Sequence, residues 1–266
     1  MRIGVIGCGH MGSWFIRGLA AEHKVAVFDS DPKKMEPLLN VERLAVPADF
    51  GSFRPEFLLN AVNLQNTLQA FDEVSGHLPD DCIISDITSV KGQIPEYYKK
   101  SRFRFASCHP MFGPNFADLY RLREENAIII SESALEAREF FKVFFKKFDL
   151  HVFECSFVEH DELMAYSLTL PFASSIVFSA CVSSHAVPGT TFSRHKKIAE
   201  KLLQEDDYLL SEVLFNPYSM KQLEKISSRL ELLKHIIKAR DYEEATKFFA
   251  RLRENLEGSK NETTSR

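Results

Sequence analysis

Residues 2–12 read RIGVIGCGHMG, an apolar run that leads into three glycines spaced as GxGxxG. The apolar run predicts a buried strand over Arg2–Gly7, and a helical pattern follows over Met11–Glu22. A second strand pattern, KVAVFD, lies at Lys24–Asp29. A glycine-rich turn between a strand and a helix, followed by a second strand, is typical of a βαβ unit that binds a dinucleotide.

Each glycine of this turn has a geometric role. Gly7 makes the tight turn, Gly9 lets the backbone approach a pyrophosphate, and Gly12 lets the helix touch the strand. The free N–H groups at the start of the helix, where His10 and Met11 lie, would then face the phosphates. The alternative is that the glycines only shape a turn and bind no ligand.

An acidic residue ends the second strand, where a dinucleotide site needs one. The Asp29 carboxylate is placed to accept hydrogen bonds from the ribose hydroxyls, and it would repel a 2′-phosphate. We therefore expect NAD as the cofactor and rank NADP below it, although Lys33 and Lys34 lie close by in the sequence. In the alternative interpretation, Asp29 only caps the next helix.

Strand patterns alternate with helical patterns as far as residue 155. Further strands are expected at Phe57–Asn63, Cys82–Ile87, Phe103–Cys108, Ala127–Ser131 and His151–Cys155, and a strongly amphipathic helix at Ala134–Phe148. This alternation indicates parallel strands joined by helical crossovers. Residues 1–155 are therefore predicted to form an α/β domain, a Rossmann-type doubly wound sheet that binds NAD.

Residues 156–257 show only helical periodicity. The helical patterns lie at Val158–Ser184, Phe192–Gln204, Asp207–Phe215, Tyr218–Ala239 and Tyr242–Leu256. About five helices cannot enclose a large core alone, so we expect an all-α domain that binds substrate and forms a homodimer. Residues 258–266, GSKNETTSR, are polar and are predicted to be a disordered tail.

The composition excludes several classes of partner. A net charge of −4 gives no long-range field that would favour nucleic acid or an anionic membrane. The five cysteines are widely spaced and include no CxxC pair, so we expect neither a disulfide framework nor a bound metal. No apolar run reaches the roughly 20 residues that span a bilayer, and the first strand begins at Arg2 with no signal peptide before it. We expect a cytoplasmic protein that binds a small molecule.

Two strand ends carry polar residues at the edge where open α/β sheets bind their ligands. One strand runs into TSVKG, residues 88–92, and another into HPMFGP, residues 109–114. Pro110 forces His109 towards an extended backbone, and a histidine held beside a nicotinamide ring is well placed for proton transfer near neutral pH. From these residues alone, His109 is equally consistent with a histidine that packs the loop.

These motifs resemble those of the prephenate/arogenate dehydrogenase family of tyrosine biosynthesis. The matching stretches are SDITSVK at residues 85–91, HPMFGP at 109–114, EHD at 159–161, MAYS at 164–167, GTTFSR at 189–194 and LFNP at 214–217. The resemblance covers residues 1–256, and the combination of GxGxxG, SVK and HPMFGP is specific. It implies that NAD oxidises a ring alcohol while carbon dioxide leaves, which makes the ring aromatic.

The resemblance also implies roles for five residues. His109 takes the proton of the substrate's ring hydroxyl, and Ser89 lies beside the same hydroxyl. Arg194 binds a substrate carboxylate. Lys91 matches the lysine of the SVK motif, and His160 matches a histidine at the mouth of the cleft. All three are therefore expected to bind substrate. Each of these three has a structural alternative: a lysine that caps its helix, an arginine on a solvated basic helix face, and a histidine at a helix N-terminus.

One position departs from the family pattern. Many members carry a second histidine 12 residues after the one matched by His160, where it helps to recognise the substrate's side chain, and Phe172 occupies that position here. Phenylalanine donates no hydrogen bond, so the side-chain pocket must differ. Pro171 also removes one helical N–H and frees the carbonyl of Ser167.

The sequence therefore predicts a prephenate dehydrogenase, which converts prephenate to 4-hydroxyphenylpyruvate with NAD. The first alternative is an arogenate dehydrogenase, which converts arogenate to tyrosine. A hydroxyacid dehydrogenase with a similar layout is a rival, although that class uses a lysine on a helix as its acid and base. A more remote alternative is an NAD-binding sensor without catalysis.

Overall fold

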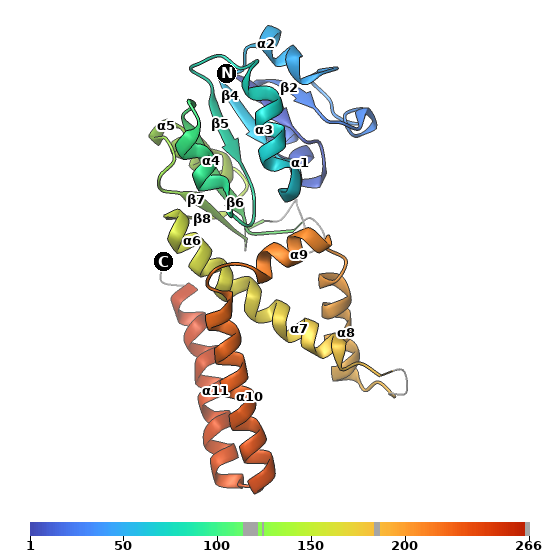
Figure 1. Ribbon diagram of the computed structural model, residues 1–266, viewed down its shortest axis with the longest axis vertical. Coiled ribbons are helices and arrows are strands. Elements are labelled where there is room, and N and C mark those ends of the chain that lie inside the picture. The colour runs from blue at the N-terminus through green and yellow to red at the C-terminus, as the bar shows by residue number, and fades with distance from the viewer. Residues whose placement is uncertain (114–121, 124, 184–186, 264–266) are drawn as a thin grey trace. The chain divides into compact units, whose positions relative to one another are not determined.

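The computed structural model describes residues 1–113, 122–123, 125–183 and 187–263. The chain divides into two compact units, Met1–Tyr218 and Ser219–Arg266, and each is considered by itself. Pro114, the last residue of the HPMFGP motif, lies outside the described residues. The larger unit begins with an α/β sheet and ends in helices, and the smaller unit is a pair of helices (Figure 1).

An eight-stranded sheet forms the first part of the larger unit. Its strands lie in the order β3-β2-β1-β4-β5-β6-β7-β8, and neighbours are parallel except for β6 and β7. The strands are β1 (Arg2–Ile6), β2 (Lys24–Phe28), β3 (Val41–Arg43), β4 (Phe57–Asn60), β5 (Ile83–Asp86), β6 (Phe105–Pro110), β7 (Asn126–Ile130) and β8 (His151–Cys155). The strand order reverses between β1 and β4, as in a doubly wound sheet, so the predicted Rossmann-type α/β fold is confirmed.

Most strand bounds differ from the sequence prediction by one to three residues, and the differences at β3 and β6 are the most informative. The sequence does not predict β3, because its three residues are too few to show a strand pattern. β6 ends at Pro110 and not at Cys108, because its last two residues still pair with β7. His109 is therefore fixed within a strand, where we expected it in the loop that follows.

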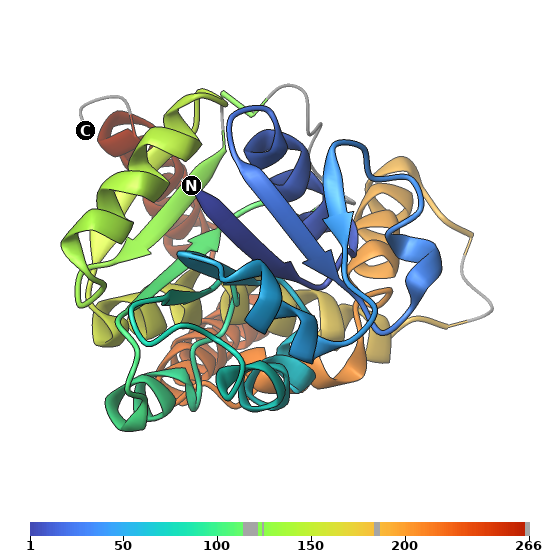
Figure 2. The same cartoon turned by 90° about the horizontal axis from the view of Figure 1, so that it is seen from above.

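Helices cover both faces of the sheet (Figure 2). They are α1 (His10–Ala20) and α5 (Leu135–Lys146) on one face, and α3 (Thr67–Ser75) and α4 (Ile94–Lys100) on the other, with the short α2 (Phe50–Phe53) before β4. Alternate residues of a strand point to opposite faces. Ile3 and Val5 of β1 therefore belong to the buried cluster of Phe141, whereas Ile6 belongs to that of Phe71.

The glycine turn after β1 brings α1 into direct contact with the strand. Gly7 has a φ of +89°, which L side chains rarely adopt, and its N–H donates to the Phe28 carbonyl at 2.9 Å. A Cβ atom on Gly12 would overlap the Gly7 carbonyl. The first residues of α1 therefore lie at the carboxyl end of β1, beside the point where the strand order reverses.

Only helices follow β8 in the part of the larger unit that the structure describes. They are α6 (Phe157–Met164), the π-helical turn η4 (Ala165–Thr169), α7 (Leu170–Ala180), α8 (Thr190–Leu202) and α9 (Asp207–Leu214). Ser156 caps α6, because its side chain accepts from the Glu159 N–H while Glu159 reaches back to Ser156. The π turn lies just before Pro171, whose missing N–H interrupts the α-helical hydrogen bonds.

The helical run Phe157–Ala180 corrects one expectation. By length and composition alone this run is apolar enough to cross a membrane, although polar residues interrupt it and hide its apolar character from a search for unbroken stretches. His160 and Met164 of the run are buried within the larger unit. A helix that packs on the core of a folded chain passes the same test, so this run is weak evidence for a membrane span.

The smaller unit is a helical hairpin. α10 (Ser219–Ala239) and α11 (Tyr242–Thr263) lie side by side (Figure 1), and Arg240 in the turn between them has a φ of +51°. α11 reaches Thr263, so residues 258–263 are helical where we expected a disordered tail. A helix extends in this way because each added residue gains one hydrogen bond to the preceding turn and needs no apolar anchor.

Candidate active site

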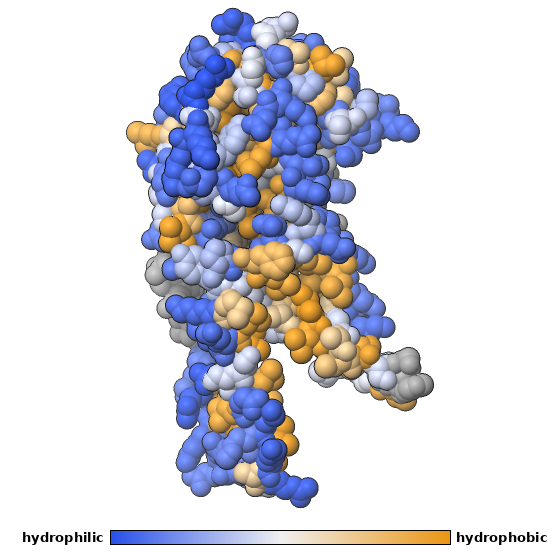
Figure 3. Space-filling model, viewed as in Figure 1, coloured by the Kyte–Doolittle hydropathy of each residue, from blue (hydrophilic) through white to orange (hydrophobic). Residues whose placement is uncertain are grey.

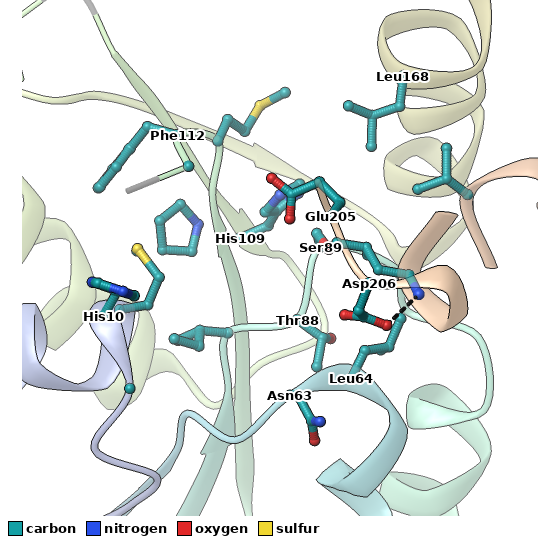
Figure 4. Close-up of a pocket in the computed structure, with 18 of the residues that line it drawn as sticks. His10, Asn63, Leu64, Thr88, Ser89, His109, Phe112, Leu168, Glu205 and Asp206 are labelled. Carbon is teal, nitrogen blue, oxygen red and sulfur yellow. Dashed lines mark hydrogen bonds between the residues drawn. The ribbon is translucent and has the colours of Figure 1, made fainter. Parts of the chain in front are cut away.

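A cavity of about 480 Å³ lies at the carboxyl ends of β1, β4, β5 and β6 (Figure 4). Its strand side includes Gly9, His10, Met11, Asn63, Ser89 and His109. Its helical wall includes Leu168, Phe172, Leu202, Glu205, Leu209 and Val213. Open α/β sheets bind ligands at this edge, where the strand order reverses, so the cavity is the candidate active site.

The start of α1 offers space and hydrogen-bond donors for a phosphate. Gly9 is the N-cap of α1, and a Cβ atom placed on it would meet nothing within 4 Å. The N–H groups of a first helical turn have no partner within the helix and bind anions well. His10 and Met11 line the cavity beside Gly9, where the sequence predicted a dinucleotide.

Asp29 follows β2, is 7% exposed and lies outside the cavity lining. Its Oδ2 accepts from the Cys8 N–H at 2.7 Å, and its Oδ1 accepts from the Asp31 N–H at 2.9 Å. The carboxylate therefore holds the glycine turn in place, and the Lys34 ammonium lies 3.7 Å from Oδ1. The residue that caps the next helical turn is Asp31, so the capping alternative for Asp29 is wrong.

His109 is 6% exposed and lines the cavity. Its Nδ1 lies 3.1 Å from Nε2 of His160, and Nδ1 of His160 lies 3.2 Å from Oδ1 of Asp161. Because a carboxylate accepts, the proton of His160 is on Nδ1, and its Nε2 accepts from the Nδ1–H of His109. The other ring nitrogen of His109, Nε2, then carries no proton and is available to the cavity.

The surroundings of His109 keep it neutral. Burial, the neighbouring His160 and the Lys91 ammonium hold the pKa of His109 well below its usual 6.5. Burial also lowers the pKa of His160, and the hydrogen bond to Asp161 opposes that shift in part. At neutral pH, His109 is therefore a base that can accept a proton.

Ser89 lies on the turn after β5, is half-buried and lines the cavity. The turn is pinned to the strand end, because Asp86 Oδ2 accepts from the Thr88 N–H at 3.0 Å and from the Thr88 hydroxyl at 2.7 Å. The fold therefore brings the two predicted catalytic residues, Ser89 and His109, to one cavity from two neighbouring strands.

Lys91 does not reach the cavity, which corrects the expectation that it binds substrate. Its ammonium is fully buried and lies 2.9 Å from Asp86 Oδ2, 2.8 Å from the Cys108 carbonyl and 3.4 Å from the Thr88 hydroxyl. Burial acts to raise the pKa of Asp86, but Lys91 and the hydrogen bond from Thr88 hold that pKa below its usual value. Lys91 therefore joins the ends of β5 and β6.

Two further predicted substrate residues also lie outside the cavity lining. Arg194 is exposed near the start of α8, and the residue of α8 that lines the cavity is Leu202, about 12 Å further along the helix. This position matches the alternative of a solvated basic helix face. His160 is fully buried and lies behind His109, and not at the mouth of the cleft.

Few sequence patterns indicated the helical wall of the cavity. Phe172 lines the cavity together with Leu168 and Leu209, so its side of the cavity is apolar. Asp206 also lines the cavity and caps α9, and the helical pattern that begins at Asp207 was a signal for such a cap. No sequence pattern marked Glu205, because a short run of acidic residues before a helix is common.

Residues 21–130 match the family described as "Prephenate dehydrogenase, nucleotide-binding domain". The chain is also 26% identical over 256 residues to a probable arogenate/prephenate dehydrogenase of Methanocaldococcus jannaschii. That match covers 89% of this chain but only 56% of the relative, so the chain spans about half the length of that protein. The resemblance read from the motifs is confirmed.

Solved structures share the fold along nearly the whole chain. A prephenate dehydrogenase of Aquifex aeolicus, in complex with hydroxyphenyl propionate and NAD+, has a TM-score of 0.81 and 18% identity, and the match covers 97% of this chain and 98% of the other. An arogenate dehydrogenase of Synechocystis has a TM-score of 0.75 and 17% identity, with 99% and 100% covered. At such identities the likeness establishes the fold alone.

The buried ion pair predicts a large effect of one substitution on stability. Lys91→Met leaves the Asp86 carboxylate buried without its cation, so we expect the free energy of unfolding to fall by about 3–5 kcal/mol. Denaturant unfolding followed by circular dichroism measures the change. Lys99→Met, which removes an exposed lysine that pairs with Glu96, is the matched control and should leave the unfolding midpoint in place. Equal midpoints for the two variants would contradict the role of Lys91.

Proposed function

Because its nucleotide-binding domain and its fold are those of the prephenate/arogenate dehydrogenase family, we propose that this chain is an NAD-dependent dehydrogenase. Its substrate is a cyclohexadienol of the prephenate type, which is oxidised at the ring hydroxyl with loss of carbon dioxide. The observation that carries the proposal is the geometry of His109, whose hydrogen bond to His160 leaves Nε2 free to accept a proton in the cavity.

The residues at the start of α1 fit a dinucleotide. The open space at Gly9 leaves room for a pyrophosphate against the helix N-terminus, and the Asp29 carboxylate nearby favours ribose hydroxyls over a 2′-phosphate. The matched nucleotide-binding domain supports the prediction of NAD. NAD, when bound, supplies the hydride acceptor. NADP ranks second, because Lys34 offsets part of the Asp29 charge.

His109 supplies the proton acceptor. Nε2 takes the proton of the ring hydroxyl as hydride leaves the same carbon. The bond between the ring and its carboxylate then breaks, carbon dioxide leaves, and the electron pair of that bond completes the aromatic ring. The proton returns from His109 to the oxygen, which ends as a phenol. Ser89, on its pinned turn, orients the hydroxyl by a hydrogen bond.

His160 and Asp161 act as positioning residues for His109. Neither contacts the substrate in this scheme, since His160 is fully buried behind His109. Asp161 holds the proton of His160 on Nδ1, which in turn obliges His109 to keep its own proton on Nδ1. This arrangement keeps the lone pair of Nε2 directed to the substrate.

The rival functions lack support at the cavity. A hydroxyacid dehydrogenase of the kind considered above needs a lysine as acid and base, and none of the described residues that line the cavity is a lysine. A nucleotide sensor needs no neutral, hydrogen-bonded imidazole at the strand ends, whereas the described geometry supplies one.

We also propose that residues 1–155 and 156–257 are separate domains, that the helical domain forms a homodimer, and that the protein is cytoplasmic. Hydrophobic side chains gather over α7, α8 and α9 on the face shown in Figure 3, and the exposed apolar residues of α7 and α8 include Val177 and Ile198. Large exposed apolar patches mark interaction surfaces.

The dimer can be tested by sedimentation equilibrium, which should give twice the chain mass of 30.4 kDa. A single-chain mass at micromolar concentration would contradict the dimer.

The first test of the function is turnover by the purified protein. We expect NADH to appear with prephenate or arogenate, faster with NAD than NADP, and His109→Asn to lower kcat by about 10²–10⁴ because the proton acceptor is lost. His195→Asn makes the same substitution at an exposed histidine outside the cavity and should keep full activity. Activity with neither substrate would refute the function, and undiminished turnover by His109→Asn would remove His109 from its role.

The second test is the pH dependence of catalysis and stability. Because the pKa of His109 is depressed, the acidic limb of kcat/KM should have its midpoint well below pH 6.5. The same depression means that stability is lost as pH falls below about 6.5, where the unfolded chain takes up the proton first. A limb midpoint at or above 6.5 would contradict a buried, neutral His109.

The Asp161→Asn variant tests, in the same activity assay, whether Asp161 positions the His160 ring or stabilises the fold. We expect kcat to fall by a factor of roughly 10–10³, because the tautomer of His160 is no longer fixed. The KM for NAD and the melting temperature should remain unchanged. Glu162→Gln, at the exposed neighbouring position, is the control. A parallel loss of kcat and melting temperature would assign Asp161 to the fold.

A further inference from the structure

The LFNP motif at residues 214–217 has no part in the chemistry described above. Its asparagine, Asn216, follows the end of α9 and is only 7% exposed. The Asn216 Nδ2 donates to the main-chain carbonyl of Asp161 on α6 at 2.9 Å. The Asn216 Oδ1 accepts from the Tyr218 N–H at 2.9 Å, which fixes the orientation of the amide. A buried side chain therefore joins the end of α9 to the residue that holds the proton of His160.

The Asp161 carbonyl lies at a break in the helical hydrogen bonding. α6 ends at Met164, and the π turn η4 begins at Ala165. The Ala165 N–H, which would serve the Asp161 carbonyl alone in a regular α-helix, is shared with the Glu162 carbonyl. Asn216 supplies the second donor to the Asp161 carbonyl. Because a carbonyl that is shielded from water needs a partner, this amide stabilises the helix register at Asp161.

The register at Asp161 decides where its carboxylate points. The Oδ1 atom lies 3.2 Å from Nδ1 of His160, at the outer limit of a hydrogen bond, so a small rotation of the end of α6 would break this contact. A His160 ring without that acceptor is free to carry its proton on Nε2, and this N–H would then face Nδ1 of His109. His109 would have to accept there and to carry its own proton on Nε2, the atom that must take the proton of the substrate.

We infer that Asn216 is a positioning residue for the proton acceptor, because it holds the Asp161 carboxylate on Nδ1 of His160. This contact keeps the lone pair of Nε2 of His109 directed to the cavity. The expected effect on turnover rests on the proposed function, but the tautomers are a property of the free protein. Val213, three residues before Asn216, lines the cavity. The segment that ends the helical wall therefore also sets the protonation of the base on the strand side.

The first measurement is made on the free protein at neutral pH. Long-range proton–nitrogen correlation spectra of the imidazole rings distinguish Nδ1–H from Nε2–H tautomers, and the His109→Asn and His160→Gln variants assign the signals. We expect both rings to be Nδ1–H tautomers in the wild type, and the His160 ring to gain the Nε2–H form in Asn216→Ala. A wild type with Nε2–H on His160, or an Asn216→Ala variant with the tautomers of the wild type, would overturn the inference.

Turnover distinguishes a positioning role from a role in the turn that follows α9. Asn216→Ala should lower kcat by about 10- to 100-fold, a smaller loss than that of an enzyme whose base is held wholly in the wrong tautomer, and should leave the KM for NAD unchanged. Asn216→Asp keeps an oxygen that accepts from the Tyr218 N–H but loses the donor to the Asp161 carbonyl, so its kcat should fall to a similar extent. Full turnover by Asn216→Asp would assign Asn216 to the turn alone and overturn the inference.

A double-mutant cycle shows whether Asn216 acts through Asp161. In an Asp161→Asn background, Asn216→Ala should cost less than about threefold in kcat, since the contact that it supports is already lost. Losses that multiply would show that Asn216 acts by another route and would overturn the inference. Asn66→Ala, which removes the same amide from an exposed position before α3 outside the cavity lining, is the control and should keep full kcat. A wild type that oxidises neither prephenate nor arogenate would overturn the proposed function, and the tautomer spectra would still decide the inference.

Discussion

The buried ammonium of Lys91 makes the contacts on which the arrangement of the proposed catalytic residues depends. It binds Asp86 at the end of β5 and the Cys108 carbonyl one residue before His109 on β6. The same aspartate also holds the turn that carries Ser89. A single satisfied charge pair inside the sheet therefore fixes the spacing between the serine and the histidine. The hydroxyl of Tyr98, which donates to Asp86 at 2.8 Å, completes the network.

The strand side of the cavity and its helical wall have different electrostatic environments. On the strand side, burial and nearby positive charge keep His109 neutral, and the hydrogen bond from its Nδ1 to His160 leaves the opposite nitrogen basic. On the helical wall, the Glu205 carboxylate lines the cavity beside apolar side chains such as Leu202 and Leu209. The first arrangement suits the proposed proton transfer.

The sequence motifs predicted one substrate site for side chains that the structure places in different surroundings. Lys91, Arg194 and His160 were all expected at the substrate, yet the first is an internal ion-pair partner, the second is exposed on α8, and the third supports His109 from behind. A motif records which side chains occur together along the chain. It does not record whether a side chain points into a cavity or into the core behind it.

The sequence by itself determined the Rossmann-type sheet, the glycine turn and the candidate base, because these depend on local periodicity, on residues without a Cβ atom, and on a motif within a few positions. Only the tertiary structure decided that His160 and Asp161 stand behind His109, and that Glu205 faces the strand ends across a cavity. His109 and His160 are 51 residues apart in the chain, and no local pattern encodes such a pairing. It arises when α6 packs against the end of β6, where burial and hydrogen bonding set the protonation states.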